Sequence, residues 1–231
     1  LDAKLGFNYY QWVYSMKVWI GILGFVGLLS TSLIAAESKV VISDFANQQL
    51  KAWETKTFKG QTQYQLVKEG QRWVLKAQAK AAASGLTRKI KVDLTKTPFL
   101  NWSWRVDQAP PPLNEQTKAG DDYAARVYVI VDGGLLVWNS KAVNYVWSAS
   151  SARGSAWGNA YLPKNAHMLA VRGKQDKTGV WVTEKRNVRA DFQSLLGVDI
   201  QAIDGVALMS DSDNSATETA ASYGDIFFSA H

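Results

Sequence analysis

The sequence contains no cysteine and only two histidines, His167 and His231. The absence of cysteine excludes disulfides, thiolate metal sites, cysteine nucleophiles and lipid attachment through cysteine. So few histidines exclude a multi-histidine metal centre such as an H-E-x-x-H zinc site. A serine triad would have to use His167, and the sequence has no G-x-S-x-G nucleophile motif. It also has no P-loop and no G-x-G-x-x-G motif, which argues against nucleotide binding.

Long apolar runs are scarce, and the one present lies near the N-terminus. Met16 is followed by a lysine, an apolar stretch and small residues up to Ala36. This order is typical of a secretory signal peptide. We therefore expect an upstream translated segment over 1–15, a signal peptide over 16–36, and one exported domain, periplasmic or secreted, over 37–231. The alternative is a retained membrane anchor, because the apolar run is just long enough to cross a bilayer.

Basic residues are in modest excess, with 26 Lys and Arg against 20 Asp and Glu. They are scattered along the chain, whereas nucleic-acid binding favours a basic stripe, so we expect no nucleic-acid partner. A mild positive charge suits anionic polymers or an anionic envelope surface. Beyond the N-terminal run no segment is long and apolar enough to span a membrane, so we expect no membrane span after signal cleavage.

Alternation of apolar and polar residues runs through most of the remaining chain. Around Trp102 and Trp104 it places both indoles on one strand face, which is predicted to be core. Residues 67–73 predict a hairpin with Gly70 at its tip. Many short strands without intervening helices predict an all-β fold, an antiparallel β-sandwich of jelly-roll type.

One short helix is predicted within this β-sandwich. It covers Val188–Leu196, where apolar residues recur on one helix face and Gly197 supplies a stop. The longest irregular stretch is Asp107–Asp122, which contains three consecutive prolines. Loops of this length in a compact domain are often functional, although a stiff surface loop is an equal alternative.

Polar side chains on the predicted strands are candidates for a ligand groove. Arg126 and Tyr128 share one strand face, and Asn144 lies on the next predicted strand facing away from Tyr145. An arginine on a central strand can bind a carboxylate through two hydrogen bonds, or it can pair with a local acid.

A second polar cluster lies further along the chain. Glu184 and Arg186 share a strand face, and the alternative there is a solvated edge with weak salt bridges.

Tryptophan is abundant, with 10 residues in the sequence. Exposed indoles can stack on the apolar faces of sugar rings, although most tryptophans are core residues. Trp157 lies among small and polar residues, so we expect it to be an exposed stacking platform. Trp138, beside a predicted turn, is a second candidate.

Two sets of acids are candidates for holding an ion, a structural calcium. Residues 211–214 (Asp-Ser-Asp-Asn) carry hard oxygens at alternating positions, which calcium favours, but lack the rest of an EF-hand loop. Asp44 on the first strand and Asp225 near the last could share an ion if the terminal strands lie side by side. For each acid the alternative is an ordinary turn hydrogen bond.

Four segments together resemble a known family. They are Asn101–Val106, Gly120–Tyr128, Asp211–Asn214 and Tyr223–Ile226. The chain from about Asp44 to Phe228 resembles exported bacterial proteins grouped as domain of unknown function family 3047. That resemblance implies an exported single domain and transfers no activity or catalytic residue. The strand pattern separately looks like jelly-roll sandwiches of the galactose-binding type, many of which bind carbohydrate.

The leading hypothesis is a non-catalytic protein that binds a cell-envelope or environmental polysaccharide. Its groove is expected to carry the polar residues above, with an indole beside them: Arg126, Tyr128, Asn144, Glu184, Arg186 and Trp157. One alternative is a hydrolase that uses Glu184 with Asp121 or Asp122. Another is a lyase in which Tyr128 acts as acid and base and Arg126 neutralises a uronate. A third is an envelope scaffold, which a large exposed apolar patch would favour.

Overall fold

The computed structural model describes residues 38–231 apart from 48–49 and 135–138. The signal segment and Trp138 lie outside the described residues. No helix in the described part of the chain is long and apolar enough to cross a membrane.

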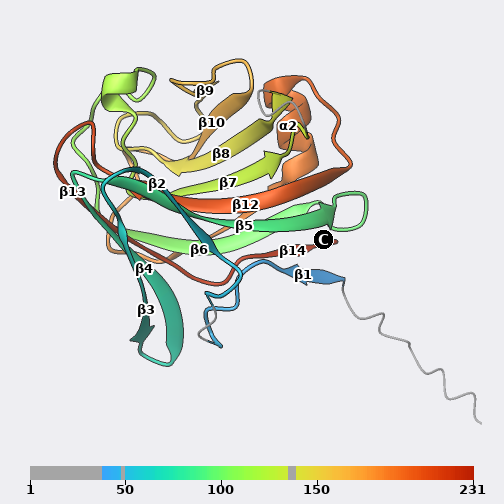
Figure 1. The fold of residues 1–231 in the computed structure, drawn as a ribbon, viewed down its shortest axis with the longest axis horizontal. Coiled ribbons are helices and arrows are strands. Elements are labelled where there is room, and N and C mark those ends of the chain that lie inside the picture. The colour runs from blue at the N-terminus through green and yellow to red at the C-terminus, as the bar shows by residue number, and fades with distance from the viewer. Residues whose placement is uncertain (1–37, 48–49, 135–138) are drawn as a thin grey trace, which may run out of the picture. The chain divides into compact units, whose positions relative to one another are not determined.

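The described residues form a β-sandwich of two sheets (Figure 1). One sheet has the order β1-β14-β6-β13-β4-β3, with β11 also paired to β6. Its strands are β1 (Lys39–Val41), β3 (Gln63–Glu69), β4 (Arg72–Lys80), β6 (Phe99–Gln108), β11 (Val182–Asn187), β13 (Glu218–Tyr223) and β14 (Phe227–Ser229). We call it the first sheet.

The second sheet has the order β2-β5-β12-β7-β8-β10-β9. Its strands are β2 (Glu54–Lys59), β5 (Ala83–Asp93), β7 (Arg126–Val131), β8 (Lys141–Trp147), β9 (Ala156–Gly158), β10 (Ala166–Arg172) and β12 (Ala202–Asp211). The predicted all-β sandwich is confirmed, with one departure: β8 and β10 run parallel, whereas the other pairs are antiparallel within the described residues.

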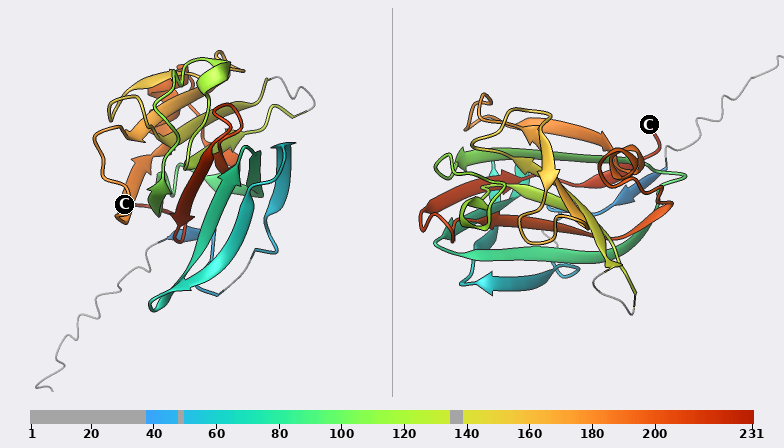
Figure 2. Two further views of the ribbon diagram at one scale, coloured as in Figure 1. Left: turned by 90° about the vertical axis from the view of Figure 1, so that its left-hand side faces the viewer. Right: turned by 90° about the horizontal axis from the view of Figure 1, so that it is seen from above.

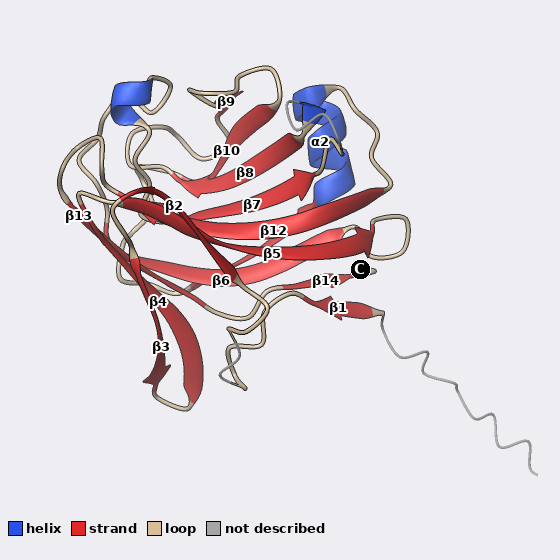
Figure 3. Ribbon diagram, in the orientation of Figure 1, coloured by secondary structure: helices blue, strands red, loops and turns tan. Residues whose placement is uncertain are grey.

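Local predictions agree with the structure in three places. The predicted helix is α2 (Val188–Leu196), which the Asn187 side chain caps and which ends at Gly197 with φ of 67° (Figure 3). The predicted hairpin joins β3 to β4 at the edge of the first sheet, with Gly70 at positive φ (Figure 2). The terminal strands β1 and β14 lie side by side.

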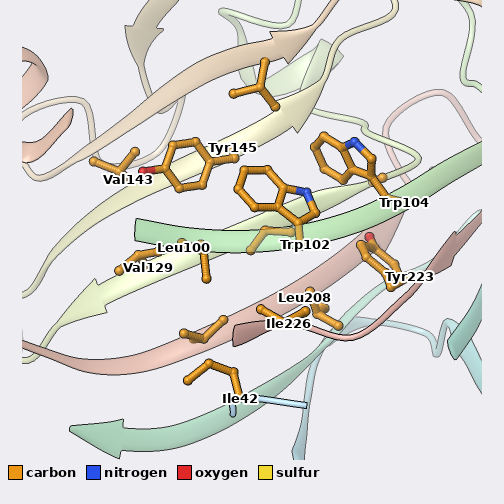
Figure 4. Packing of buried hydrophobic residues seen from close by; sticks show 14 of the residues in the cluster. Ile42, Leu100, Trp102, Trp104, Val129, Val143, Tyr145, Leu208, Tyr223 and Ile226 are labelled. Carbon is orange, nitrogen blue, oxygen red and sulfur yellow. The ribbon is translucent and has the colours of Figure 1, made fainter. Parts of the chain in front are cut away.

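The core lies between the two sheets and is rich in aromatic residues. Trp102 from β6 stacks on Tyr145 from β8 with ring centroids 5.2 Å apart (Figure 4). Trp104 meets Trp147 edge-on, with ring centroids 5.9 Å apart. The two indoles share a buried face, as the alternation predicts. Because side chains alternate along a strand, the neighbours of Tyr145 point to the opposite, outer face of the second sheet.

Candidate functional site

A cleft of about 670 Å³ lies on the outer face of the second sheet. Its floor consists of side chains from β5, β7, β8, β10 and β12. Arg126 and Tyr128 contribute from β7, where Val127 and Val129 face the core. Asn144 is the cross-strand neighbour of Tyr128. Strict alternation on two adjacent strands therefore brings these three predicted residues together.

Arg126 is the charged centre of the cleft floor, and its side chain is buried. Its Nη1 donates a hydrogen bond to Asp121 Oδ2 at 3.2 Å, and its Nη2 donates to the Asp121 carbonyl oxygen at 3.1 Å. The guanidinium also pairs with the buried carboxylate of Asp211. The ring of Tyr123 lies 4.5 Å away. Because protein carboxylates already neutralise it, this arginine is not free to bind a ligand carboxylate.

Tyr128 and Asn144 supply neutral polar groups beside this arginine. The Tyr128 hydroxyl donates to Met209 Sδ at 3.4 Å, and Asn144 Nδ2 donates to Met168 Sδ at 3.2 Å. Asn144 Oδ1 is buried and has no hydrogen-bond partner among the described residues. Burial raises the pKa of Tyr128, against the opposing charge of Arg126. Tyr128 is therefore a neutral hydroxyl at physiological pH and poorly suited to act as a base.

Exposed apolar side chains border the cleft. Phe58, Tyr161 and Leu162 are 64%, 52% and 62% exposed and all three line it. The described residues contain only two other exposed large apolar side chains. Asn159 holds the Tyr161–Leu162 segment in place, since its Oδ1 accepts hydrogen bonds from both backbone amides at 3.0 and 3.1 Å. Large apolar groups are thus concentrated at one site.

The long loop before β7 is anchored by two buried acids. Glu115 accepts hydrogen bonds from the amides of Ala149 and Ser150 at 2.7 and 3.2 Å and from the Ser148 hydroxyl. Asp122 accepts from the amides of Asn214 and Ser215 at 3.1 and 2.6 Å. Burial raises the pKa of Glu115, although these hydrogen bonds oppose the rise. The anchors fix the loop end that carries Asp121 at the cleft.

The structure brings further acids together at one end of this loop. Carboxylate oxygens of Asp122, Asp211 and Asp213 lie within 4.8 Å of one another. By contrast, Asp44 accepts hydrogen bonds from Asn47, and Asp225 Oδ1 accepts from the Phe45 amide at 2.9 Å. Asp44 therefore makes the turn hydrogen bond that was the alternative to a shared ion, whereas Asp225 bonds across the terminal segments to the amide that follows Asp44.

A family model described as protein of unknown function (DUF3047) matches residues 51–227. The chain belongs to this family. The resemblance predicted from the four sequence motifs is thus confirmed. A search of curated proteins finds no match.

The DUF3047 chain is also similar to solved β-sandwich structures. One is the family 11 carbohydrate-binding module of cellulase Lic26A-Cel5E of Clostridium thermocellum, with 9% identity, TM-score 0.47, and coverage of 85% of this chain and 97% of that one. Another is the carbohydrate recognition domain of Emp47p, with 12% identity and TM-score 0.44; the match covers 86% of this chain and 99% of that one. A third is the CBM22-1 xylan-binding domain from Paenibacillus barcinonensis Xyn10C, with 11% identity and TM-score 0.37; the match covers 85% of this chain and 98% of that one.

Trp157 of this DUF3047 chain is not the exposed platform that the sequence suggested. The residue is only 8% exposed and packs in a small cluster with Tyr123, Val146 and Met168. It lies on β9, which pairs with β10. The expectation of exposure is wrong, because the small residues around Trp157 form a short strand and do not leave an open loop.

Glu184 and Arg186 are also absent from the cleft lining. Both lie on β11, which pairs with β6 in the first sheet. Glu184 Oε1 accepts hydrogen bonds from Arg172 Nε at 2.5 Å and from Trp104 Nε1 at 3.2 Å. Arg186 Nε donates to Asp191 Oδ2 at 3.0 Å. The expectation that they share a groove with Arg126 is wrong: Glu184 is paired with Arg172 of β10 and Arg186 with Asp191 of α2, and neither side chain lines the cleft.

Phe58 and Tyr161 are not among the site residues predicted from the sequence. The predicted stacking platforms are tryptophans, which are mostly core residues here. A usable signal was present: Phe58 is the single large apolar residue in an otherwise polar strand, and Tyr161 follows an Asn-Ala pair in a turn-rich segment.

Proposed function

We propose that the cleft binds a carbohydrate and that the protein is a non-catalytic carbohydrate-binding protein. The observation that carries this proposal is the concentration of exposed Phe58, Tyr161 and Leu162 around a floor of polar side chains. A sugar presents apolar C–H faces and hydroxyl edges. Flat aromatic rings suit the former, and amide or hydroxyl groups suit the latter. The cleft volume is in the range of small-ligand sites.

Polar groups in the cleft support recognition of hydroxyls. In the part of the chain that the structure describes, the side-chain amide of Asn214, which lines the cleft, makes no hydrogen bond. Tyr128 adds a neutral hydroxyl whose present acceptor is a thioether sulfur, a weak acceptor. Hydrogen bonds to a sugar would satisfy these groups better than the sulfur does.

The geometry favours binding over the two reactions considered from the sequence. Hydrolysis needs two carboxylates that face each other across a groove. Glu184 lies on β11, outside the cleft lining, and its carboxylate is engaged by Arg172. The lyase reading needs Tyr128 as a base and Arg126 as a free cation. Burial raises the pKa of Tyr128, and the carboxylates of Asp121 and Asp211 neutralise Arg126.

Export and a polysaccharide of the cell envelope or environment remain part of the proposal. They rest on the signal-like pattern over 16–36 and on the excess of basic residues. The exposed apolar residues that an envelope scaffold would present border a cleft that also carries polar groups, which suits a sugar better than a protein surface.

The test is isothermal titration of the protein with a panel of neutral and acidic oligosaccharides. Phe58→Ala and Tyr161→Ala are each expected to weaken binding by about 1 kcal/mol, roughly fivefold, by removing a stacking surface. Val180→Ala is the matched control, because Val180 is 51% exposed and lies outside the cleft lining. No heat with any glycan at protein concentrations near millimolar, or equal effects of all three substitutions, would contradict the proposal.

A further inference from the structure

The acid cluster beside the cleft is assembled from two separate segments of the chain. Asp122 lies four residues before β7 in the long loop that precedes this strand. Asp211 is the last residue of β12, and Asp213 lies in the turn that follows. One carboxylate oxygen of each lies within 4.8 Å of the others. Asp122 and Asp211 are buried, and both Asp211 and Asp213 line the cleft. The cluster is therefore continuous with one end of the cleft.

A fourth acid beside the cluster has an unsatisfied oxygen. Asp121 is only 6% exposed, and its Oδ2 accepts a hydrogen bond from Arg126. Its Oδ1 is buried and has no hydrogen-bond partner in the described part of the chain. Asp121 precedes Asp122 in the chain and shares the Arg126 guanidinium with Asp211, so it lies beside the cluster. A buried carboxylate oxygen without a donor calls for an explanation such as an ion.

The charges at this place do not balance among the described residues. Four carboxylates face two cations, namely Arg126 and Lys59. The Lys59 side chain is mostly exposed and its Nζ lies 3.8 Å from Asp213 Oδ2, so water screens its charge in part and the compensation is incomplete. Burying carboxylates without full compensation is costly. A divalent cation at this place would supply the missing charge.

We propose that Asp122, Asp211 and Asp213 bind one Ca²⁺ ion at the end of the cleft. Hard carboxylate oxygens in an irregular arrangement suit Ca²⁺, whereas Mg²⁺ demands near-octahedral geometry and keeps most of its water. The existing hydrogen bonds do not prevent metal binding. Each carboxylate oxygen has two lone pairs, so it can accept a hydrogen bond from an amide and bind a metal ion at the same time. The amides of Asn214, Ser215 and Tyr123 instead fix the carboxylates of Asp122 and Asp211.

This site differs from the ion site that the sequence suggested at Asp44 and Asp225. It uses two acids of the 211–214 segment and completes them with Asp122, which lies about 90 residues earlier in the chain and reaches Asn214 and Ser215 across that separation. The proposal stands independently of carbohydrate binding.

The experiment is calorimetric titration of CaCl₂ into the chelator-treated protein. The expected result is one site per chain with a dissociation constant below about 1 mM. Asp213→Asn is expected to weaken Ca²⁺ binding at least tenfold, because it removes one charged ligand. Asp44→Asn is the matched control and is expected to bind as the parent does. A folded parent that takes up no Ca²⁺, or Asp213→Asn binding as tightly as the parent, would overturn the proposal.

A second variant keeps the test decisive should Asp213→Asn fold poorly. Lys59→Met removes the ammonium group that shares Asp213 with the ion. Ca²⁺ affinity is then expected to rise several-fold, and the Ca²⁺-dependent rise in melting temperature should grow with it. A purely structural role for these acids predicts no such gain, so unchanged or lower affinity in Lys59→Met counts against the site.

Discussion

The arginine at the centre of the cleft floor permits a quantitative prediction. Arg126→Met keeps most of the side-chain length but leaves the buried carboxylates of Asp121 and Asp211 without their common cation. Removing one partner of a buried ion pair costs about 3 to 5 kcal/mol. For a domain of this size about 1 kcal/mol changes the melting temperature by roughly 2 to 4 °C, so the expected loss is roughly 6 to 20 °C.

The assay is urea unfolding at pH 7 in the presence of a chelator, with the slope m checked for constancy. Arg126→Lys should fall between the parent and Arg126→Met, because lysine retains the charge but lacks the planar fork that reaches two acids. Arg189→Met is the control: Arg189 makes a similar paired contact with Asp199, but on the exposed surface. If Arg126→Met destabilises no more than this control does, Arg126 is not the charge that holds the cleft floor together.

Two further predictions concern other acids. Glu115→Ala should destabilise the fold by about 2 kcal/mol, because it leaves the Ser148 hydroxyl and the Ala149 amide without their acceptor. Glu115→Gln keeps an acceptor and should cost less stability. Equal urea midpoints for the two variants would contradict this prediction. Hydrogen bonds from Arg105 lower the pKa of Glu69 in the folded protein. This pair therefore contributes its full stability above the unfolded-state pKa of Glu, about 4.3. The contribution is lost as the pH falls through the lower folded-state pKa. Arg105→Met should therefore lose less stability than the parent between pH 6 and 3, and parallel stability curves would refute the assignment.

Much of the fold follows from local patterns. The period of two around Trp102 and Trp104 fixes which face is buried, and Gly197 at positive φ fixes where the helix ends. The same alternation placed Arg126 and Asn144 outward on neighbouring strands, which is why the sequence could bring these two together. Each of these features depends on residues close in sequence.

The remaining site features depend on pairing across the molecule. Alternation shows that Glu184 and Arg186 share a face, but not that β11 pairs with β6 in the first sheet. Exposure likewise depends on what packs over a segment: Trp157 is covered, while Phe58 on the edge strand β2 is open. The meeting of Asp122 with Asp213 arises from two loops far apart in sequence, which no local pattern specifies.

The most direct test of the account is an amide-resolved NMR titration with the tightest-binding glycan of the panel. If the cleft is the binding site, the shifts should cluster at residues 58–59, 126–128, 159–166 and 211–214, which surround it. Shifts confined to the first sheet, for example along the β3–β4 hairpin, would place the ligand elsewhere and contradict the account.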